Sequence, residues 1–169
     1  PDGNLPLHSA CLKALADGVV EKLVNTYPAA TSIVNAVGNL PVHYSAEKRC
    51  TQPVMKFLLD ANPEGTKAKS AEGLIPLQIA AQFQAQDDVV QELLRVHPDG
   101  TRAKDSKGRY PVRIAFEHKG SDGVIDQLLI INPAAASEKD DVGKLLLHYA
   151  AEKQASDSVV RSLLTAYHD

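Results

Sequence analysis

The sequence of 169 residues contains no tryptophan, one methionine, two cysteines and only 5% aromatic residues. A hydrophobic core must therefore be built from aliphatic side chains and alanine, which dominate its 44% apolar content. Cys11 and Cys50 are too few for a disulfide framework, and we expect both to be buried thiols in a reducing compartment. The net charge of −3 does not indicate a nucleic-acid-binding or membrane-surface protein.

Several functional motifs are also absent. No apolar run approaches the roughly 18 residues that a membrane span needs. The sequence has no Gly-x-Ser-x-Gly, no phosphate loop and no Cys/His pair with a third orienting group. We therefore expect no enzyme activity, no cofactor and no membrane insertion, and a location inside the cell, in the cytoplasm or the nucleus.

What the sequence does contain is one pattern written five times. Its glycines recur at a fixed spacing (38 − 3 = 35), and a proline follows three residues after each of the first four. A fixed period of this length predicts a solenoid, in which each copy packs only on its neighbours. The expected copies are 1–35, 36–70, 71–105, 106–140 and 141–169, in one domain. The glycines are Gly3, Gly38, Gly73, Gly108 and Gly143.

Each copy reads as two helices followed by a long finger. The proline after the glycine suits the first turn of a helix. An aspartate in four copies is predicted as the N-cap of a second helix, which carries an amphipathic Val-Val and Leu-Leu stripe. A second proline is expected to stop that helix. The four aspartates are Asp17, Asp87, Asp122 and Asp157.

In copies one, two and five, the residues at the start of the first predicted helix resemble the motif of a known repeat family. Leu5–Ala10, Leu40–Ala46 and Leu145–Ala151 read Leu-Pro-Leu-His-Ser-Ala, Leu-Pro-Val-His-Tyr-Ser-Ala and Leu-Leu-Leu-His-Tyr-Ala-Ala. This pattern resembles the Thr-Pro-Leu-His-x-Ala-Ala motif of the ankyrin repeat, in register over the whole chain. The resemblance implies an all-α solenoid whose helix-turn-helix pairs are joined by fingers like β-hairpins. It also implies a partner on the concave face, formed by finger tips and first helices.

The sequence departs from the ankyrin pattern in two ways. Its period exceeds the usual value of about 33 residues, and Leu, Ile or Tyr replaces the threonine before the proline. The histidine therefore needs another hydrogen-bond partner, which we expect to be a backbone carbonyl in an adjacent finger. Copies three and four carry Gln78 and Arg113 instead of the histidine.

Other assignments fit the pattern less well. Pentatricopeptide repeats have longer helices and short turns, which leave no room for the finger. Tetratricopeptide repeats place large aromatic residues at fixed sites. A metal site built from His8, His43 and His148 is not expected, because equivalent residues of stacked helices lie roughly 8–10 Å apart and zinc ligands lie about 2 Å from the metal.

The columns that differ between copies are the candidates for partner contacts, because packing does not fix them. From Arg95 to Arg113 six basic and two acidic residues give +6 − 2 = +4. Basic charge beside apolar side chains is typical of an interaction hot spot. We therefore predict a partner protein with an acidic surface or peptide, docked on copies three and four. The candidate residues are Lys69, Glu72, Leu74, Gln82, Phe83, Lys104, Lys107, Arg109, Glu117, His118, Lys139 and Lys144.

These observations favour a non-catalytic, monomeric scaffold for protein–protein interaction. One alternative is a structural spacer or a regulatory arm of a larger enzyme or signalling protein. A weaker one is a binder of acidic polymer or nucleic acid, for which no stacking platform is present. We also expect a segment of a longer array or larger protein, because the sequences of the end copies do not differ from those of the interior copies, whereas a terminal copy needs a polar outer face. The residues expected to be exposed there are Leu7, Ala10, Val20, Leu23, Val159, Val160, Leu163 and Leu164.

Overall fold

The computed structural model describes residues 2–140 and 142–168, which form ten α-helices, four 3₁₀ helices and no strand. The predicted ten helices in five pairs are thereby confirmed, whereas the fingers contain no β-hairpin in the part described. The pairs are α1 (Pro6–Leu12) with α2 (Asp17–Thr26), α3 (Pro41–Glu47) with α4 (Gln52–Ala61), α5 (Pro76–Gln82) with α6 (Asp87–Val96), α7 (Pro111–Glu117) with α8 (Asp122–Ile131), and α9 (Leu146–Glu152) with α10 (Asp157–His168).

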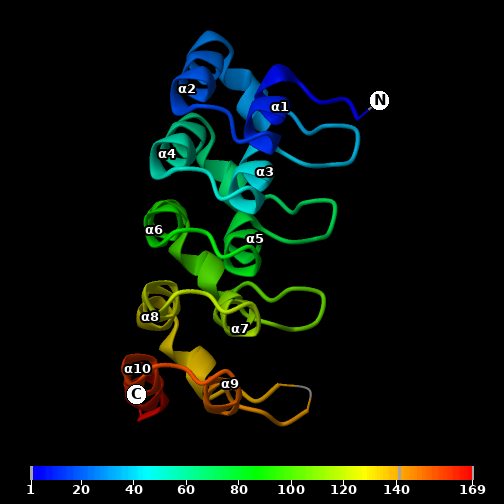
Figure 1. Cartoon of the computed structure of the whole chain (residues 1–169). Helices are drawn as coiled ribbons and strands as arrows, with labels where there is room; N and C mark the ends of the chain where they lie inside the picture. The colour runs from blue at the N-terminus through cyan, green and yellow to red at the C-terminus, as the bar shows by residue number, and fades with distance from the viewer. Residues whose placement is uncertain (1, 141, 169) are drawn as a thin grey trace.

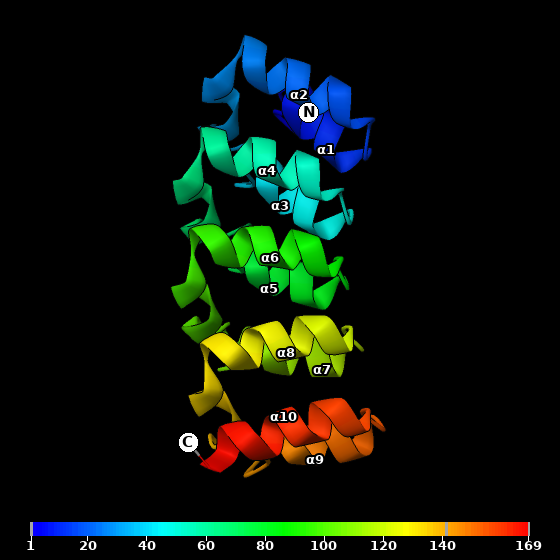
Figure 2. The same cartoon turned by 90° about the vertical axis from the view of Figure 1, so that its left-hand side faces the viewer.

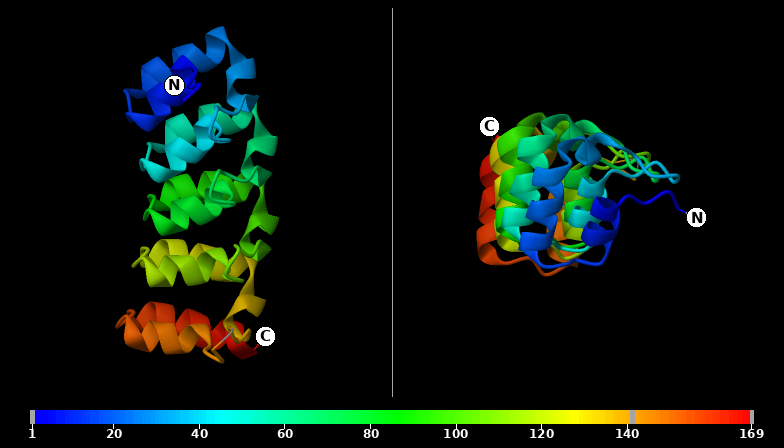
Figure 3. Two further views of the ribbon diagram at one scale, coloured as in Figure 1. Left: turned by 90° about the vertical axis from the view of Figure 1, so that its right-hand side faces the viewer. Right: turned by 90° about the horizontal axis from the view of Figure 1, so that it is seen from above.

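The five pairs stack in chain order. The odd-numbered helices form one column and the even-numbered helices a second (Figure 1). Loops 33–40, 68–75, 103–110 and 138–145, which we call the finger loops, project from the odd-numbered column. The even-numbered helices lie side by side on the opposite face (Figure 2), and the loops gather along one side of the stack (Figure 3). None of the described helices is long and apolar enough to cross a membrane.

The aspartates predicted as N-caps lie one position further on, so that prediction is wrong. Each is the first residue of its even-numbered helix, where its negative charge interacts favourably with the positive end of the helix dipole. In three of the four, the carboxylate accepts a hydrogen bond from a hydroxyl that precedes the corresponding helix of the next copy. Thr51 donates to Asp17 at 2.8 Å, Ser121 donates to Asp87, and Ser156 donates to Asp122 at 2.6 Å.

The second proline of each copy does more than stop a helix. The α-helix ends before it, as predicted, but the proline also begins a 3₁₀ helix that sequence reasoning had assigned to the finger. A threonine hydroxyl bonds back to the proline carbonyl in three of these helices, for example Thr66 to Pro63 at 2.7 Å. The four helices are η1 (Pro28–Ser32), η2 (Pro63–Lys67), η3 (Pro98–Arg102) and η4 (Pro133–Ala136).

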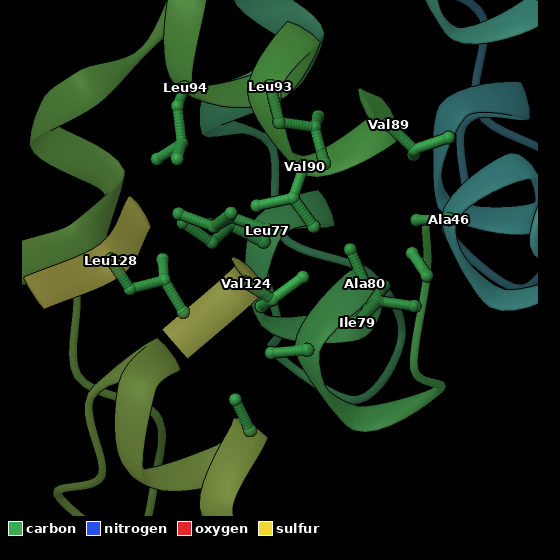
Figure 4. Packing of buried hydrophobic residues seen from close by; sticks show 14 of the residues in the cluster. Ala46, Leu77, Ile79, Ala80, Val89, Val90, Leu93, Leu94, Val124 and Leu128 are labelled. Carbon is green, nitrogen blue, oxygen red and sulfur yellow. The ribbon is translucent and has the colours of Figure 1, made fainter. Parts of the chain in front are cut away.

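Aliphatic side chains fill the space between the two columns and between successive copies. Leu77 and Ala80 of α5 and Leu93 of α6 pack with Val124 and Leu128 of α8 (Figure 4). Seven of the eight end-copy residues that we expect from the sequence to be exposed instead lie in this core or pack against it. Leu7, Ala10, Val20, Val159 and Leu163 are buried, Leu23 and Val160 are partly buried, and Leu164 is exposed.

Candidate protein-interaction surface

Each finger loop folds around a polar side chain three residues before its glycine. Asp105 Oδ1 accepts the backbone N–H groups of Lys107 at 2.9 Å and Arg109 at 2.8 Å. Asn35, Ser70 and Asp140 make the same pair of bonds in their own loops. Gly108 has φ +72°, a left-handed conformation that glycine adopts at little cost. The tips are therefore fixed turns that present the residues beside the glycine.

In copies one to three, one buried side chain ties the first helix to a finger loop. His43 Nδ1 accepts the N–H of Leu40 at 2.9 Å, and His43 Nε2 bonds the carbonyl of Ala68 in the next loop at 3.0 Å. His8 makes the equivalent bonds to Leu5 and Asn39. The expected partner of these two histidines, a backbone carbonyl in an adjacent finger, is confirmed.

His148 Nδ1 likewise accepts the N–H of Leu145, at 3.0 Å. Within the described residues, no group of three or more His, Cys, Asp or Glu side chains is arranged to hold a metal ion.

Arg109 lies inside a salt-bridge network. The prediction that its guanidinium is free to contact a partner is therefore wrong. Its guanidinium contacts Asp105 Oδ2 at 2.7 Å and also bonds Glu117 at the end of α7. Its side chain is 14% exposed and that of Asp105 only 1%. Burial opposes ionisation of Asp105, but its bonds from the amides and guanidinium of the loop keep the pKa of that carboxyl below its usual value.

The network continues into copy five through Arg113, which replaces the histidine in copy four. Arg113 bonds Glu117 at 3.1 Å and Asp140 of the next finger loop at 3.2 Å. Asp140 also accepts the hydroxyl of Tyr149 at 2.6 Å, and the Arg113 guanidinium lies 4.9 Å from the centre of that ring. Arg113 thus joins a first helix to the next finger as histidine does in copies one and two, but through charge.

Two more lysines of the predicted partner site, Lys104 and Lys144, form ion pairs within the chain. Lys104 contacts Glu138 at 2.8 Å and lies 4.6 Å from the centre of the Tyr110 ring, whose hydroxyl donates to the same Glu138 at 2.6 Å. Lys144 pairs with Glu152 on α9. Because Arg95 and Arg102 also have acidic partners, Lys107 is the one cation of the stretch 95–113 without an ion pair to a described residue.

The structure therefore narrows the predicted site. Leu74 is 6% exposed and part of the core, so it is unavailable to a partner. Lys69, Lys107 and Lys139 are exposed and form no ion pair with a residue that the structure describes. Phe83, at the end of α5, is 39% exposed. Glu72 is exposed as well, while Gln82 and His118 are half-buried beside the end of their helices.

Sequence reasoning missed Asp105, Arg113, Glu138, Asp140 and Tyr149 as parts of this surface. One signal was available for two of them. Asp105 and Asp140 share the position three residues before a glycine, where Asn35 and Ser70 also stand, and side chains of this kind bond their own turn. The ion pairs had no such signal in the sequence, because they depend on which side chains of neighbouring copies face each other in the stack.

No family model matches the chain, and no curated protein matches it.

Proposed function

We propose that this chain is an ankyrin-type solenoid that binds a partner protein on its finger side, without catalysis. The proposal is carried by one observation: Lys69, Lys107 and Lys139 project from finger loops whose backbone is fixed by repeated hydrogen bonds. A rigid frame with variable exposed side chains lets a surface specify a partner without loss of core packing. The ankyrin assignment itself rests on the sequence motif and on the five stacked helix pairs.

The partner that fits is an acidic segment with apolar side chains. Carboxylates would meet the three lysines, which have no internal partner among the described residues. Phe83, the exposed aromatic side chain nearest to them in sequence, would supply apolar contact. The charged contacts should mainly raise the association rate and weaken with added salt, because screening acts over about 10 Å at 0.1 M.

Selection from a displayed peptide library tests the proposal. We expect selected peptides to be rich in Asp, Glu and apolar residues. Reversal of two lysines, Lys69→Glu with Lys107→Glu, should weaken their binding at least about tenfold. The matched control is Lys22→Glu with Lys56→Glu on the even-numbered helices, which should bind as the unchanged protein does.

Two results would count against this function. Loss of binding in the control, with none in the lysine pair on the fingers, would move the site to the even-numbered helices. Failure to select any peptide, in a protein shown to be folded, would favour the structural spacer instead.

A further inference from the structure

Ile130 on α8 interrupts a polar row. Its side chain is 79% exposed, the largest value among the exposed large apolar residues of the described chain. The equivalent residues of the other copies are Asn25, Asp60, Arg95 and Thr165, and Arg95 bonds Asp60 at 3.2 Å across α4 and α6. These residues belong to the even-numbered helices, which lie side by side on the face opposite the odd-numbered column (Figure 2). A single exposed apolar side chain does not by itself indicate a partner, so the surface around Ile130 decides whether this residue has one.

A groove lies on each side of Ile130. The first, between α8 and α10, has a volume of about 420 Å³, and Leu129, Pro133 and Ala166 supply apolar walls. The second, between α6 and α8, has about 360 Å³ and includes Leu94 and Ile131. Both exceed the roughly 150 Å³ of a cavity that holds benzene, so each is large enough for an apolar side chain. The face therefore carries a projecting apolar side chain with a receptive groove on either side.

Each groove contains one polar acceptor that has no hydrogen-bond partner among the described residues. Asp126 Oδ1 is buried and has no hydrogen-bond donor. Gln127, which lines the second groove, likewise has a buried Oε1 without a donor. Arg161 lines the same groove as Asp126 but forms no ion pair with it or with any other described residue. A buried acceptor without a donor costs free energy that an incoming donor would recover.

We propose that this face binds the same face of a second copy of the chain around a two-fold axis. Projection and groove lie on one surface, and so do the unmet acceptor and the unpaired cation, which is the self-complementarity that a two-fold interface requires. Ile130 of each copy enters a groove of the other, as ridges enter grooves between packed helices. Arg161 of each copy then reaches Asp126 of the other.

The size of the patch indicates a weak dimer. The ten residues of α8 extend about 15 Å, so α8 and its two grooves cover less than the roughly 800 Å² per partner of a stable interface. We therefore expect a weak, transient dimer that forms only at high protein concentration. This inference departs from the monomer expected from the sequence. It is independent of the proposed finger-side function, because the two surfaces lie on opposite faces.

Sedimentation of the purified chain over about 10 µM to 1 mM tests the dimer. We expect the mass to rise to that of two chains and no further. Ile130→Asp should weaken association at least about tenfold, because it would bury an unpaired charge. Val34→Asp, which changes an exposed apolar residue of a finger loop, should leave it unchanged. A chain that stays monomeric over the whole range, or grows beyond two copies, would overturn the proposal.

A charge exchange tests the two-fold arrangement itself. Asp126→Arg and Arg161→Asp should each weaken the dimer, and the double variant should restore it, because each cross-interface pair is then reformed with opposite sign. Circular dichroism of all variants verifies that the monomer is folded. A double variant as weak as the sum of the single ones would show that these two residues do not meet across the axis. Dimerisation that survives Ile130→Asp would place the interface elsewhere.

Discussion

His43 and Gln78 occupy the same position in adjacent copies and make the same two hydrogen bonds. Each accepts a backbone N–H three residues before it, from Leu40 at 2.9 Å and from Ile75 at 3.0 Å. Each also bonds the carbonyl of an alanine in the next finger loop, Ala68 at 3.0 Å or Ala103 at 3.1 Å. Glutamine therefore replaces the neutral imidazole without loss of either bond.

The first prediction uses this equivalence. Burial lowers the pKa of His43 below 6.5, the ordinary value for histidine, despite the opposing hydrogen bond to Ala68. The unfolded chain thus binds more protons, so stability is complete above pH 6.5 and is lost as the pH falls below it. Burial also lowers the pKa of His8. Urea unfolding between about pH 7 and 5 should show this loss, and it should shrink in His8→Gln with His43→Gln.

The reverse variant serves as its control. Gln78→His should add pH dependence in the same range, because it creates a third buried imidazole. If both variants follow the pH dependence of the unchanged protein, other groups govern its acid sensitivity.

The second prediction concerns the turn between paired helices. Ala14, Arg49, Gln84, Lys119 and Gln154 all have φ between +48° and +58°. A left-handed residue with a side chain costs about 1–2 kcal/mol, and glycine loses about 0.5–1 kcal/mol in chain entropy. Ala14→Gly should therefore stabilise the protein by up to about 1 kcal/mol in urea unfolding.

Gly38→Ala should do the opposite. Its φ is +91°, and an added Cβ meets no atom within 4 Å. The expected loss of about 1 kcal/mol would then come from the backbone alone. Equal effects of the two substitutions would contradict the assigned turn geometry.

The third prediction concerns the two cysteines, which are buried and free, as the sequence indicated. Burial raises the pKa of Cys11 to about 11 and that of Cys50 to about 12. A thiol reagent at about pH 8 should then react at least about a hundredfold more slowly with the native chain than with the unfolded one, where both thiols should titrate at once. Fast reaction of either thiol in the folded protein would contradict this burial.

The fourth prediction concerns Arg113. Its replacement by alanine leaves Asp140, whose side chain is 5% exposed, without this cation, and should destabilise the fold more than loss of an exposed ion pair does. Amide hydrogen exchange should quicken at Val142 and Lys144, whose N–H groups bond Asp140. Arg102→Ala removes an exposed pair with Asp99 and should cost less than about 1 kcal/mol. Equal losses from the two variants would show that the network adds little.

The sequence predicts the local structure better than the surface. Period, prolines and the Val-Val and Leu-Leu stripes report local geometry and packing, so the helix pairs and their order follow from them. Pro63 was interpreted only as a stop because a proline at the start of a 3₁₀ helix has the same local signature. The helix-start aspartates were misplaced by one residue, since Asp also favours the first turn.

The candidate site depended on distances that the sequence does not contain. Arg109 and Glu117 are eight residues apart and looked like two independent contacts, yet the turn of the finger brings them together. From the sequence we expect Leu74 to be exposed, because the equivalent residues of the next two copies are the charged Arg109 and Lys144. In copy three, however, a leucine at that position turns into the core. Charge counted along a segment therefore overstates the charge that a partner meets.

The bonds from Thr51 to Asp17, Ser121 to Asp87 and Ser156 to Asp122 each join one copy to its neighbour, and the extensive helix contacts all lie within one copy or between neighbouring copies. No central element holds the five copies at once. A chain pulled from both ends should therefore give way one copy at a time, each step releasing 35 residues, or about 120 Å of contour. Under tension the molecule would act as a spring that lengthens in equal increments.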